Sequence, residues 1–268
     1  MPESNIAATP ASGQAALAYW ECKAEMYPRP EDPGPAKRAL QLRAHAAELG
    51  TRFAVNVVLD AGAGTGVHTL ALAQLARQVV AIDLSPSMLA PLSTRLGESP
   101  SAPANITVHD ADFVMLDLSS RGWIKAFDLV WCCMTPISGD AQGLIQLDRA
   151  SRDQVCCVTW GPNREDPLFA EAFALHGAQF RAPAWRETII AHAAKHGHRL
   201  RHRTIVNQTV QHIAPEALAT DLAHHMRWLG VTPDLALLQD WSQSKARDGM
   251  VERVLDADQE IWLWSVGD

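Results

Sequence analysis

Long apolar runs are missing from this sequence. Its 268 residues contain no stretch of eighteen or more apolar residues, so we expect no membrane-spanning helix. The first residues, MPESNIAATP, also lack a basic segment followed by an apolar one, which is the pattern of a secretory signal. We therefore expect a cytosolic protein.

Positive charge is also scarce. Lysine and arginine number 23 against 30 for aspartate and glutamate, which gives a formal net charge of −7. The basic residues are dispersed, and the one short basic run extends from Lys195 to Arg203. Because nucleic-acid binding needs a strongly positive face, this balance disfavours a nucleic-acid partner, although it leaves room for a local basic patch.

Metal-binding cysteine motifs are absent as well. There are five cysteines and no C-x-x-C, and four of the five form the adjacent pairs Cys132/Cys133 and Cys156/Cys157 within apolar runs. Adjacent residues of a strand point to opposite faces of the sheet, so neither pair can bind one metal ion from one side. The pattern predicts reduced, buried thiols.

The stretch PRPEDPGP, from Pro28 to Pro35, separates an N-terminal helix from the rest of the chain. Its four prolines break any helix, so we expect a linker there. The preceding stretch, AALAYWECKAEMY, is typical of an amphipathic helix and holds Tyr19, Trp20 and Tyr27. This helix either closes over the site as a lid or simply covers the edge of the sheet.

Strand and helix patterns alternate from Ala54 to Trp160, and this order predicts an α/β protein with a parallel sheet covered on both faces. After Trp160 the alternation stops, and more chain follows than simple connections need. We therefore predict a lid and linker over 1–35, a main domain over 36–268, and cap insertions within 161–249. The expected strands are 54–60, 78–84, 105–110, 127–133, 154–160, one long strand over 199–213 and a last strand over 260–266; the expected later helices are 167–178, 183–196, 215–229 and 234–245.

A glycine-rich loop follows the first expected strand, in VLDAGAGTGVHTLALA. Gly62, Gly64 and Gly66 come directly after Asp60, and glycine lets the backbone approach a ligand where a strand turns into a helix. The dinucleotide fingerprint G-x-G-x-x-G requires a third glycine at the position of Val67. The loop therefore favours a nucleotide ligand other than a dinucleotide.

Three further features lie at the ends of the next strands. Asp83 ends the second strand, and its carboxylate can accept hydrogen bonds from both hydroxyls of a ribose, a contact that would also suit NAD. The stretch TVHDADF follows the third strand and offers Asp110 with Ala111, or Asp112 if the register is shifted by two. The fourth strand is FDLVWCC.

These four features occur in order over residues 54–160, and together they resemble the class I S-adenosylmethionine-dependent methyltransferases. The resemblance implies a Rossmann-like seven-stranded sheet, mostly parallel, of order 3-2-1-4-5-7-6, with an antiparallel last strand. It also implies S-adenosyl-L-methionine as the cofactor, its methionyl part on the glycine loop, its ribose on Asp83 and its adenine at Asp110. The implied cofactor-binding residues are Asp60, Ala61, Gly62, Gly64, Gly66, Asp83, Leu84, Met88, Asp110, Ala111 and Cys132.

The acceptor is less defined. The fourth strand continues as CCMTPISGD, which lacks the N-P-P-Y of amino methyltransferases acting on nucleic acid bases. It also lacks the acidic residues of metal-dependent catechol-type enzymes and of protein arginine enzymes. A small-molecule acceptor is therefore expected by elimination. A cofactor-binding partner or sensor without turnover, and an RNA methyltransferase, are the alternatives; an oligomer is compatible with the sequence.

Catalytic residues are predicted only weakly. Methyl transfer needs alignment above all, and a general base is needed for some acceptors only. The candidates are His68, His109, Tyr19 and Tyr27, although His68 also fits a helix surface and His109 a structural strand end. Tryptophans that either line an acceptor pocket or pack in the core are Trp20, Trp160 and Trp185.

Histidines are concentrated between His192 and His202, with His192 and His196 spaced to share one helical face. This spacing is compatible with a metal site. However, Lys195, Arg199 and Arg201 are interspersed, and positive neighbours disfavour a cation. We predict a solvated surface and no metal for the group His192, His196, His198 and His202.

Overall fold

The structure is a computed structural model that describes residues 12–99, 102–179, 184–206 and 208–267. Within these residues the chain folds into two compact units. Two of the boundaries between the units fall inside strands β5 (Ser151–Glu165) and β8 (Val251–Ser265). The core unit consists of 12–159, 185–204 and 260–267, and the insert unit of 160–179, 184, 205–206 and 208–259.

The core unit alternates strands and helices, as predicted. Continuous apolar strands such as β4 are buried on both faces, which is the signature of a covered parallel sheet. Its elements are α1 (Gly13–Lys23), the short 3-10 helix η1 (Ala24–Met26), α2 (Pro33–Leu49), β1 (Val57–Ala61), α3 (Val67–Ala73), β2 (Gln78–Asp83), α4 (Pro86–Glu98), β3 (Ile106–Asp110), β4 (Phe127–Cys133), the 3-10 helix η2 (Pro136–Gly139), α5 (Ala141–Ala150), α7 (Trp185–His196) and β6 (Arg201–Ile205), with the first part of β5 and the last part of β8.

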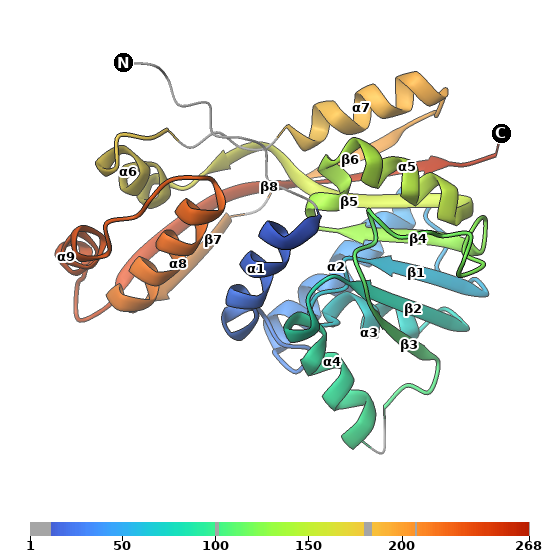
Figure 1. Cartoon of the computed structure of the whole chain (residues 1–268), viewed down its shortest axis with the longest axis horizontal. Coiled ribbons are helices and arrows are strands. Elements are labelled where there is room, and N and C mark those ends of the chain that lie inside the picture. The colour runs from blue at the N-terminus through green and yellow to red at the C-terminus, as the bar shows by residue number, and fades with distance from the viewer. Residues whose placement is uncertain (1–11, 100–101, 180–183, 207, 268) are drawn as a thin grey trace. The chain divides into compact units, whose positions relative to one another are not determined.

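The order of the strands confirms the predicted topology. The sheet runs β3-β2-β1-β4-β5-β8-β6, and Figure 1 shows β3, β2, β1 and β4 as successive neighbours. Strands β1, β2, β3, β4 and β5 pair in parallel. The last strand, β8, pairs antiparallel with β7 (Gln208–Ile213). The carboxyl ends of β1, β2 and β3 therefore meet at one edge, where the glycine loop begins.

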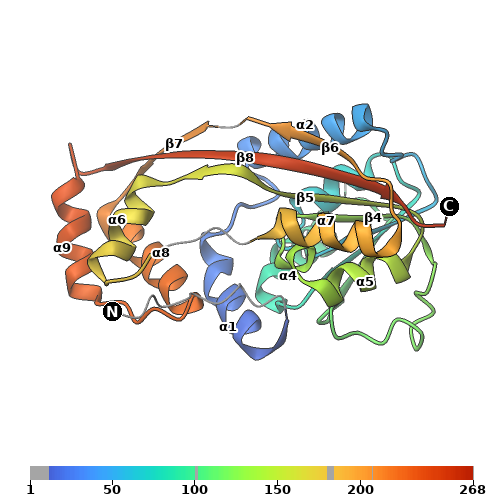
Figure 2. The same cartoon turned by 90° about the horizontal axis from the view of Figure 1, so that it is seen from above.

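Helices cover both faces of the core-unit sheet. Figure 2 shows α2 on one face and α5 and α7 on the other, and α3 packs against α2. Between sheet and helices lies one large hydrophobic cluster that includes Leu59, Phe127, Val155 and Trp262. Burial of such side chains contributes about 1.5–3 kcal/mol each to the free energy of folding.

Local signals explain where several helices begin and end. Ser85 caps α4 by accepting a hydrogen bond from the Met88 N–H at 3.1 Å, and Pro86 occupies the first helical position. Gly50 ends α2 with a φ of 113°. The expectation of a linker up to residue 35 is wrong at its end, because α2 already begins at Pro33; proline is tolerated in a first turn, whose N–H groups have no helical partner.

The insert unit has its own hydrophobic core. It contains α6 (Pro167–Leu175), α8 (Pro215–Trp228) and α9 (Leu235–Lys245), together with β7 and parts of β5 and β8. Side chains of the three helices form a separate cluster, with Phe173, Leu222, Met226 and Leu238 fully buried.

No helix of the described residues combines the length and apolar character needed to cross a membrane.

The single long strand predicted over 199–213 is wrong. The structure has two strands there, β6 and β7, which makes the sheet eight-stranded. The boundary between the units falls after Thr204, one residue before β6 ends, and the Val206 side chain is 85% exposed. β6 therefore belongs mainly to the core unit and β7 to the insert unit. A hydrophobic pattern along the sequence does not reveal that neighbouring segments belong to different units. The other predicted strands are present, and β5 and β8 are longer than predicted.

The four cysteines of the adjacent pairs are buried and free, as predicted, and Cys22 is exposed. Residue 183, the predicted start of a helix, lies outside the described residues. The helix is observed from Trp185.

Candidate active site at the carboxyl ends of the strands

The glycine loop leaves β1 in a conformation that excludes side chains at two positions. Gly62 and Gly66 have φ values of 77° and 87°, in the left-handed region. A Cβ atom on Gly62 would lie 2.6 Å from Thr135 Oγ1, and one on Gly66 would lie 2.7 Å from Leu92 Cδ1. The loop is therefore packed against the end of β4 on one side and against α4 on the other.

Asp83, at the end of β2, joins the glycine loop to the next helix. Its Oδ2 accepts a hydrogen bond from the Gly64 N–H at 2.9 Å, and its Oδ1 accepts one from the Ser85 N–H at 3.0 Å. Its backbone carbonyl accepts from the Ala111 N–H at 2.9 Å. Burial raises the pKa of the Asp83 carboxyl. Three of the sequence features thus meet at Asp83: the glycine loop at its carboxylate and the segment after β3 at its backbone carbonyl.

Asp60, at the end of β1, is 1% exposed. Its Oδ2 accepts a hydrogen bond of 2.6 Å from the Thr69 hydroxyl of α3. Burial raises the pKa of the Asp60 carboxyl to about 7, the Thr69 hydrogen bond lowers it, and the nearby Asp83 raises it further. Asp60 therefore orients the helix that follows the loop, and its charge is poised to change near neutral pH.

The two acids after β3 have different environments. Asp112 accepts hydrogen bonds from the Val114 N–H at 3.1 Å and from the Gly13 N–H of α1 at 2.9 Å. Asp110 is exposed and lies beside Asp83 in the strand register. The structure thus uses Asp112 to shape the loop and to bind α1, and leaves Asp110 at the edge of the sheet.

Two side chains flank Gly64. A Cβ atom on Gly64 would lie 3.4 Å from Met88 Cε and 4.0 Å from Tyr27 Cε1. Burial raises the pKa of the Tyr27 phenol to about 12, with smaller contributions from Cys133 and Asp83. Leu84 is partly buried next to Asp83, and Ala61 is buried in the core. The predicted residues around the loop are therefore brought together.

The segment from α1 to Pro28 contacts this site, and sequence reasoning missed the residues involved. Glu21 accepts hydrogen bonds from the Ser85 hydroxyl at 2.5 Å and from the Ser87 N–H at 3.1 Å. Hydrogen bonds from Ser85 and Ser87 hold the pKa of the Glu21 carboxyl below its usual value. The Thr65 hydroxyl of the glycine loop donates to the Pro28 carbonyl at 2.6 Å.

Aromatic rings add to these contacts. Trp20 and Tyr27 pack edge to face, with ring centroids 5.8 Å apart, and Tyr19 packs on Trp20 at 4.9 Å. The amphipathic pattern indicated a lid helix. The particular pairing of Glu21 with two serines of α4 has no signal in the sequence beyond the capping role of Ser85.

His68 and Cys133 form a pair beside the end of β4. His68 Nε2 lies 3.3 Å from Cys133 Sγ. Burial lowers the pKa of His68 to about 4 and raises the pKa of the Cys133 thiol well above its usual value, so both groups are neutral at pH 7. The Cys132 thiol is fully buried in the hydrophobic core.

His109 is placed elsewhere. Its ring packs edge to face on Trp123, with centroids 5.1 Å apart, and its Nδ1 lies 3.3 Å from Arg121 Nη1. Burial and the Arg121 charge lower the pKa of His109. The structure therefore brings His109 together with Arg121 and Trp123 rather than with the glycine loop.

The turn after β4 was not predicted. Met134 has a φ of 55°, which is uncommon for a residue with a side chain, and its N–H donates to the Val158 carbonyl at 2.8 Å. Thr135 caps η2, and its side chain occupies the space that Gly62 leaves free. The absent side chain at Gly62 was the only sequence signal for this contact. Trp185 packs in the same way against Gly139 of η2.

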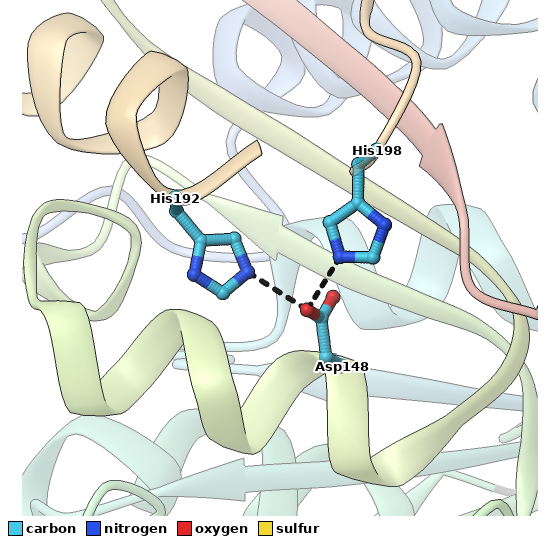
Figure 3. A group of neighbouring side chains, drawn as sticks. All are labelled: Asp148, His192 and His198. Atoms are coloured by element: carbon cyan, nitrogen blue, oxygen red, sulfur yellow. Dashed lines mark hydrogen bonds and ion pairs between the residues drawn. The ribbon is translucent and has the colours of Figure 1, made fainter. Parts of the chain in front are cut away.

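The prediction of a solvated surface for the histidine group is wrong for two of its members. His192 is 7% exposed, and His192 and His198 both contact Asp148 of α5, as Figure 3 shows. The pattern on α7 did not reveal this, because Asp148 comes from a different helix. His196 is exposed, and His202 stacks on Trp262.

Comparisons with known proteins fit this geometry. Residues 58–159 match the family described as a methyltransferase domain. No curated protein matches the sequence. The solved YcgJ protein of Bacillus subtilis shares 16% identity, with a TM-score of 0.54, over 87% of this chain and 100% of its own. The BH2331 protein of Bacillus halodurans, provisionally described as a methyltransferase, shares 15% identity over 85% and 99%, with a TM-score of 0.54.

A third similar structure is that of phosphoethanolamine N-methyltransferase 2 of Haemonchus contortus, solved with phosphomonomethylethanolamine and S-adenosylhomocysteine. It shares 16% identity, with a TM-score of 0.51, over 94% of this chain and 57% of its own length. These likenesses concern the fold, whereas the family match spans the segment from β1 into β5 that carries all four sequence features. Residues 58–159 are therefore similar to a methyltransferase domain, and they lie on a fold that the chain shares with solved methyltransferase structures.

Proposed function

We propose that this protein transfers a methyl group from S-adenosylmethionine to a small-molecule acceptor. The observation that carries the proposal is the Asp83 carboxylate, held by the Gly64 and Ser85 N–H groups at the edge where β1, β2 and β3 end. Ligands of open α/β sheets bind at this edge. Asp83 then accepts from the ribose hydroxyls, and the glycine loop contacts the methionyl part.

The charges around the loop support a cationic ligand without phosphates. Asp60, Asp83 and Asp110 are acidic, and none of the residues implied as cofactor contacts is basic. Carboxylates repel a pyrophosphate, whereas they attract a sulfonium and an ammonium. The exposed Asp110 is the group we assign to the adenine amine, because Asp112 is already hydrogen-bonded to the backbone.

Segment α1 acts as the lid in this proposal. Its hydrogen bonds to Ser85, Ser87 and Asp112 connect it to the segments that follow β2 and β3. Tyr27 lies over Gly64, where it excludes water from the bound cofactor. The cofactor supplies an electrophilic methyl group, and the chain aligns the acceptor and shields it.

The protonation states near β4 bear on the acceptor atom. A general base works best when its pKa lies near the working pH. His68 has a pKa lowered to about 4, and Tyr27 one raised to about 12. Neither is suited to remove a proton at pH 7. This favours an acceptor that is already nucleophilic, such as a neutral amine or a thiolate, over an alcohol.

Ligand binding and methyl transfer test the proposal. Calorimetry is expected to show one S-adenosylhomocysteine bound per chain and no binding of NAD. With methyl-labelled S-adenosylmethionine and a cell extract, the label is expected in the low-mass fraction. Label in RNA, or binding without any transfer, would support one of the two alternatives instead. Binding of NAD in place of S-adenosylhomocysteine would refute the assignment of the cofactor.

The pH dependence of binding tests the role of Asp60. Its pKa is raised to about 7 in the ligand-free protein, so below pH 7 the group is mostly the neutral acid. In the proposed complex the ammonium at the amino-acid end of the ligand lies beside Asp60 and favours its carboxylate form. Binding therefore releases a proton, and the affinity for the ligand rises with pH. Between pH 6 and 8 the affinity for S-adenosylhomocysteine is expected to increase about tenfold.

The matched variant is Asp60→Asn, which keeps an acceptor for the Thr69 hydroxyl and has no charge to titrate. Its affinity is expected to lack this rise, and subtracting its profile removes the titration of the ligand's own amine. Parallel profiles for the two proteins would mean that Asp60 orients only the loop.

A further inference from the structure

Three side chains of the core unit, outside the candidate cofactor residues, converge on one point. His192 Nε2 and His198 Nε2 each lie 2.7 Å from Oδ2 of Asp148. Figure 3 shows the two rings directed at the carboxylate, one from α7 and one from the segment after it. The side chains are 6%, 12% and 14% exposed for His192, His198 and Asp148, so the group is largely buried yet reachable.

We propose that Asp148, His192 and His198 form a binding site for a divalent transition-metal ion of the Zn²⁺ type. Their ligand atoms all lie within 4.8 Å of one another. Two imidazole nitrogens and one carboxylate oxygen are a ligand set that suits Zn²⁺, whereas Mg²⁺ and Ca²⁺ prefer oxygen ligands. Three protein ligands leave a fourth tetrahedral position for water.

The surroundings of the carboxylate resemble those of metal sites in general. Trp264 Nε1 donates to Asp148 Oδ1 at 2.8 Å, which orients the carboxylate and leaves Oδ2 to face the two histidines. Metal-binding carboxylates are held by outer hydrogen bonds of this kind. The His192 and His198 rings also lie beside one another, with centroids 5.6 Å apart. The ligands therefore come from separate segments that are already fixed by packing.

Without metal, the same atoms form hydrogen bonds. Tetrahedral zinc with bonds of about 2.0–2.1 Å separates its ligand atoms by about 3.3 Å, so binding requires Asp148 Oδ2 to withdraw by about half an ångström. Each neutral histidine then carries its proton on Nδ1 and presents Nε2 to the ion. The nearby cations oppose binding: Lys125 Nζ donates to the Asp148 carbonyl at 3.1 Å, and Lys195 lies on α7.

The site would be structural rather than catalytic. Asp148 lies near the end of α5, just before β5 begins, and Trp264 lies near the end of the antiparallel β8. Both positions are at the amino ends of the parallel strands, opposite the edge that carries the glycine loop. A bound ion would tie α5 to α7, and the inference does not depend on the proposed function.

The experiment is zinc binding by the full chain. The protein is freed of metal with EDTA and titrated with ZnSO₄ in a calorimeter, and bound zinc is counted by elemental analysis after dialysis. One Zn²⁺ per chain is expected, with a rise in Tm on binding. Co²⁺ is expected to give the absorption of a four-coordinate ion.

Matched variants locate the ion. In His192→Gln/His198→Gln each glutamine retains an N–H donor for Asp148, and the affinity is expected to fall more than about 100-fold, since outer-shell changes alone cost 10- to 100-fold. The controls are His202→Gln, whose ring stacks on Trp262, and Cys22→Ser, which removes an exposed thiol. Both should bind zinc like the wild type.

Two results would overturn the proposal. One is wild-type protein that retains no zinc after dialysis, and the other is a double variant that binds as tightly as wild type. If the double variant does not fold, His198→Gln alone decides, through the Co²⁺ spectrum: an unchanged spectrum would show that the ion binds elsewhere.

Discussion

Replacing Asp83 by alanine is expected to weaken binding of S-adenosylhomocysteine by about 100-fold or more. A hydrogen bond to a charged group contributes about 1.5–3 kcal/mol, and two ribose hydroxyls are expected to donate to this carboxylate. Even part of that sum, about 3 kcal/mol, corresponds to more than a hundredfold in Kd. The loss is larger than for any other single contact because Asp83 also holds the Gly64 and Ser85 N–H groups in place.

That second role requires a variant that separates binding from loop geometry. Asp83→Asn keeps one oxygen acceptor for the backbone, so its loss of affinity should be smaller than that of Asp83→Ala and still exceed tenfold. Asp117→Ala is the matched control, because Asp117 is an exposed aspartate of the core unit whose carboxylate accepts from the Ser119 hydroxyl at 2.7 Å. Calorimetry at a temperature where circular dichroism shows folded protein gives the comparison. An affinity within threefold of wild type for Asp83→Ala would refute the assigned site.

The features that could be predicted from the sequence are those that a short segment determines by itself, such as the glycine loop and the acid that ends a strand. Gly62 and Gly66 are needed because Thr135 and Leu92 occupy the space of a side chain, and their φ values are positive. Asp83 ends a buried strand, and the ends of neighbouring parallel strands must meet. Strand order followed from the resemblance, and the structure confirms it.

The parts that were missed depend on contacts between distant segments. Glu21 and Ser87 are 66 residues apart in sequence, and His192 and Asp148 are 44 apart. No periodicity in either segment specifies its partner. The division of 199–213 into two strands was missed for the same reason, because the two halves belong mainly to different units. Hydrophobic pattern identifies which face is buried, but it does not identify what covers that face.

Among the described residues of the insert unit, the most buried ion pairs are those of Arg253 with Asp166 and Asp221. Arg253 of β8 donates through Nε to Asp166 Oδ2 at 2.8 Å and through Nη1 to Asp221 Oδ2 at 3.1 Å. The three side chains are only 10–16% exposed. Burial lowers the pKa of Arg253, but the hydrogen bonds and charges of Asp166 and Asp221 outweigh burial and raise it. Asp166 also caps α6 by accepting from the Phe169 N–H at 3.1 Å.

Arg253→Met is therefore expected to lower the free energy of unfolding of the insert unit by about 3–5 kcal/mol, because it removes the guanidinium that donates to two largely buried carboxylates. The measurement is urea unfolding followed by circular dichroism and tryptophan fluorescence. Lys245→Met is the matched control in the same unit, since its pair with Glu171 is 34% and 48% exposed and contributes about 0–1 kcal/mol. Adding Asp221→Asn to Arg253→Met should recover part of the loss.

A second readout separates this effect from the cofactor site. All the residues assigned to cofactor binding belong to the core unit, so folded Arg253→Met protein is expected to bind S-adenosylhomocysteine with wild-type affinity. If Arg253→Met lowers the free energy of unfolding no more than Lys245→Met does, the two aspartates are solvated in solution and the ion pair does not stabilise the unit. If stability falls and the double variant recovers nothing, the arginine acts through its apolar stem rather than through its charge.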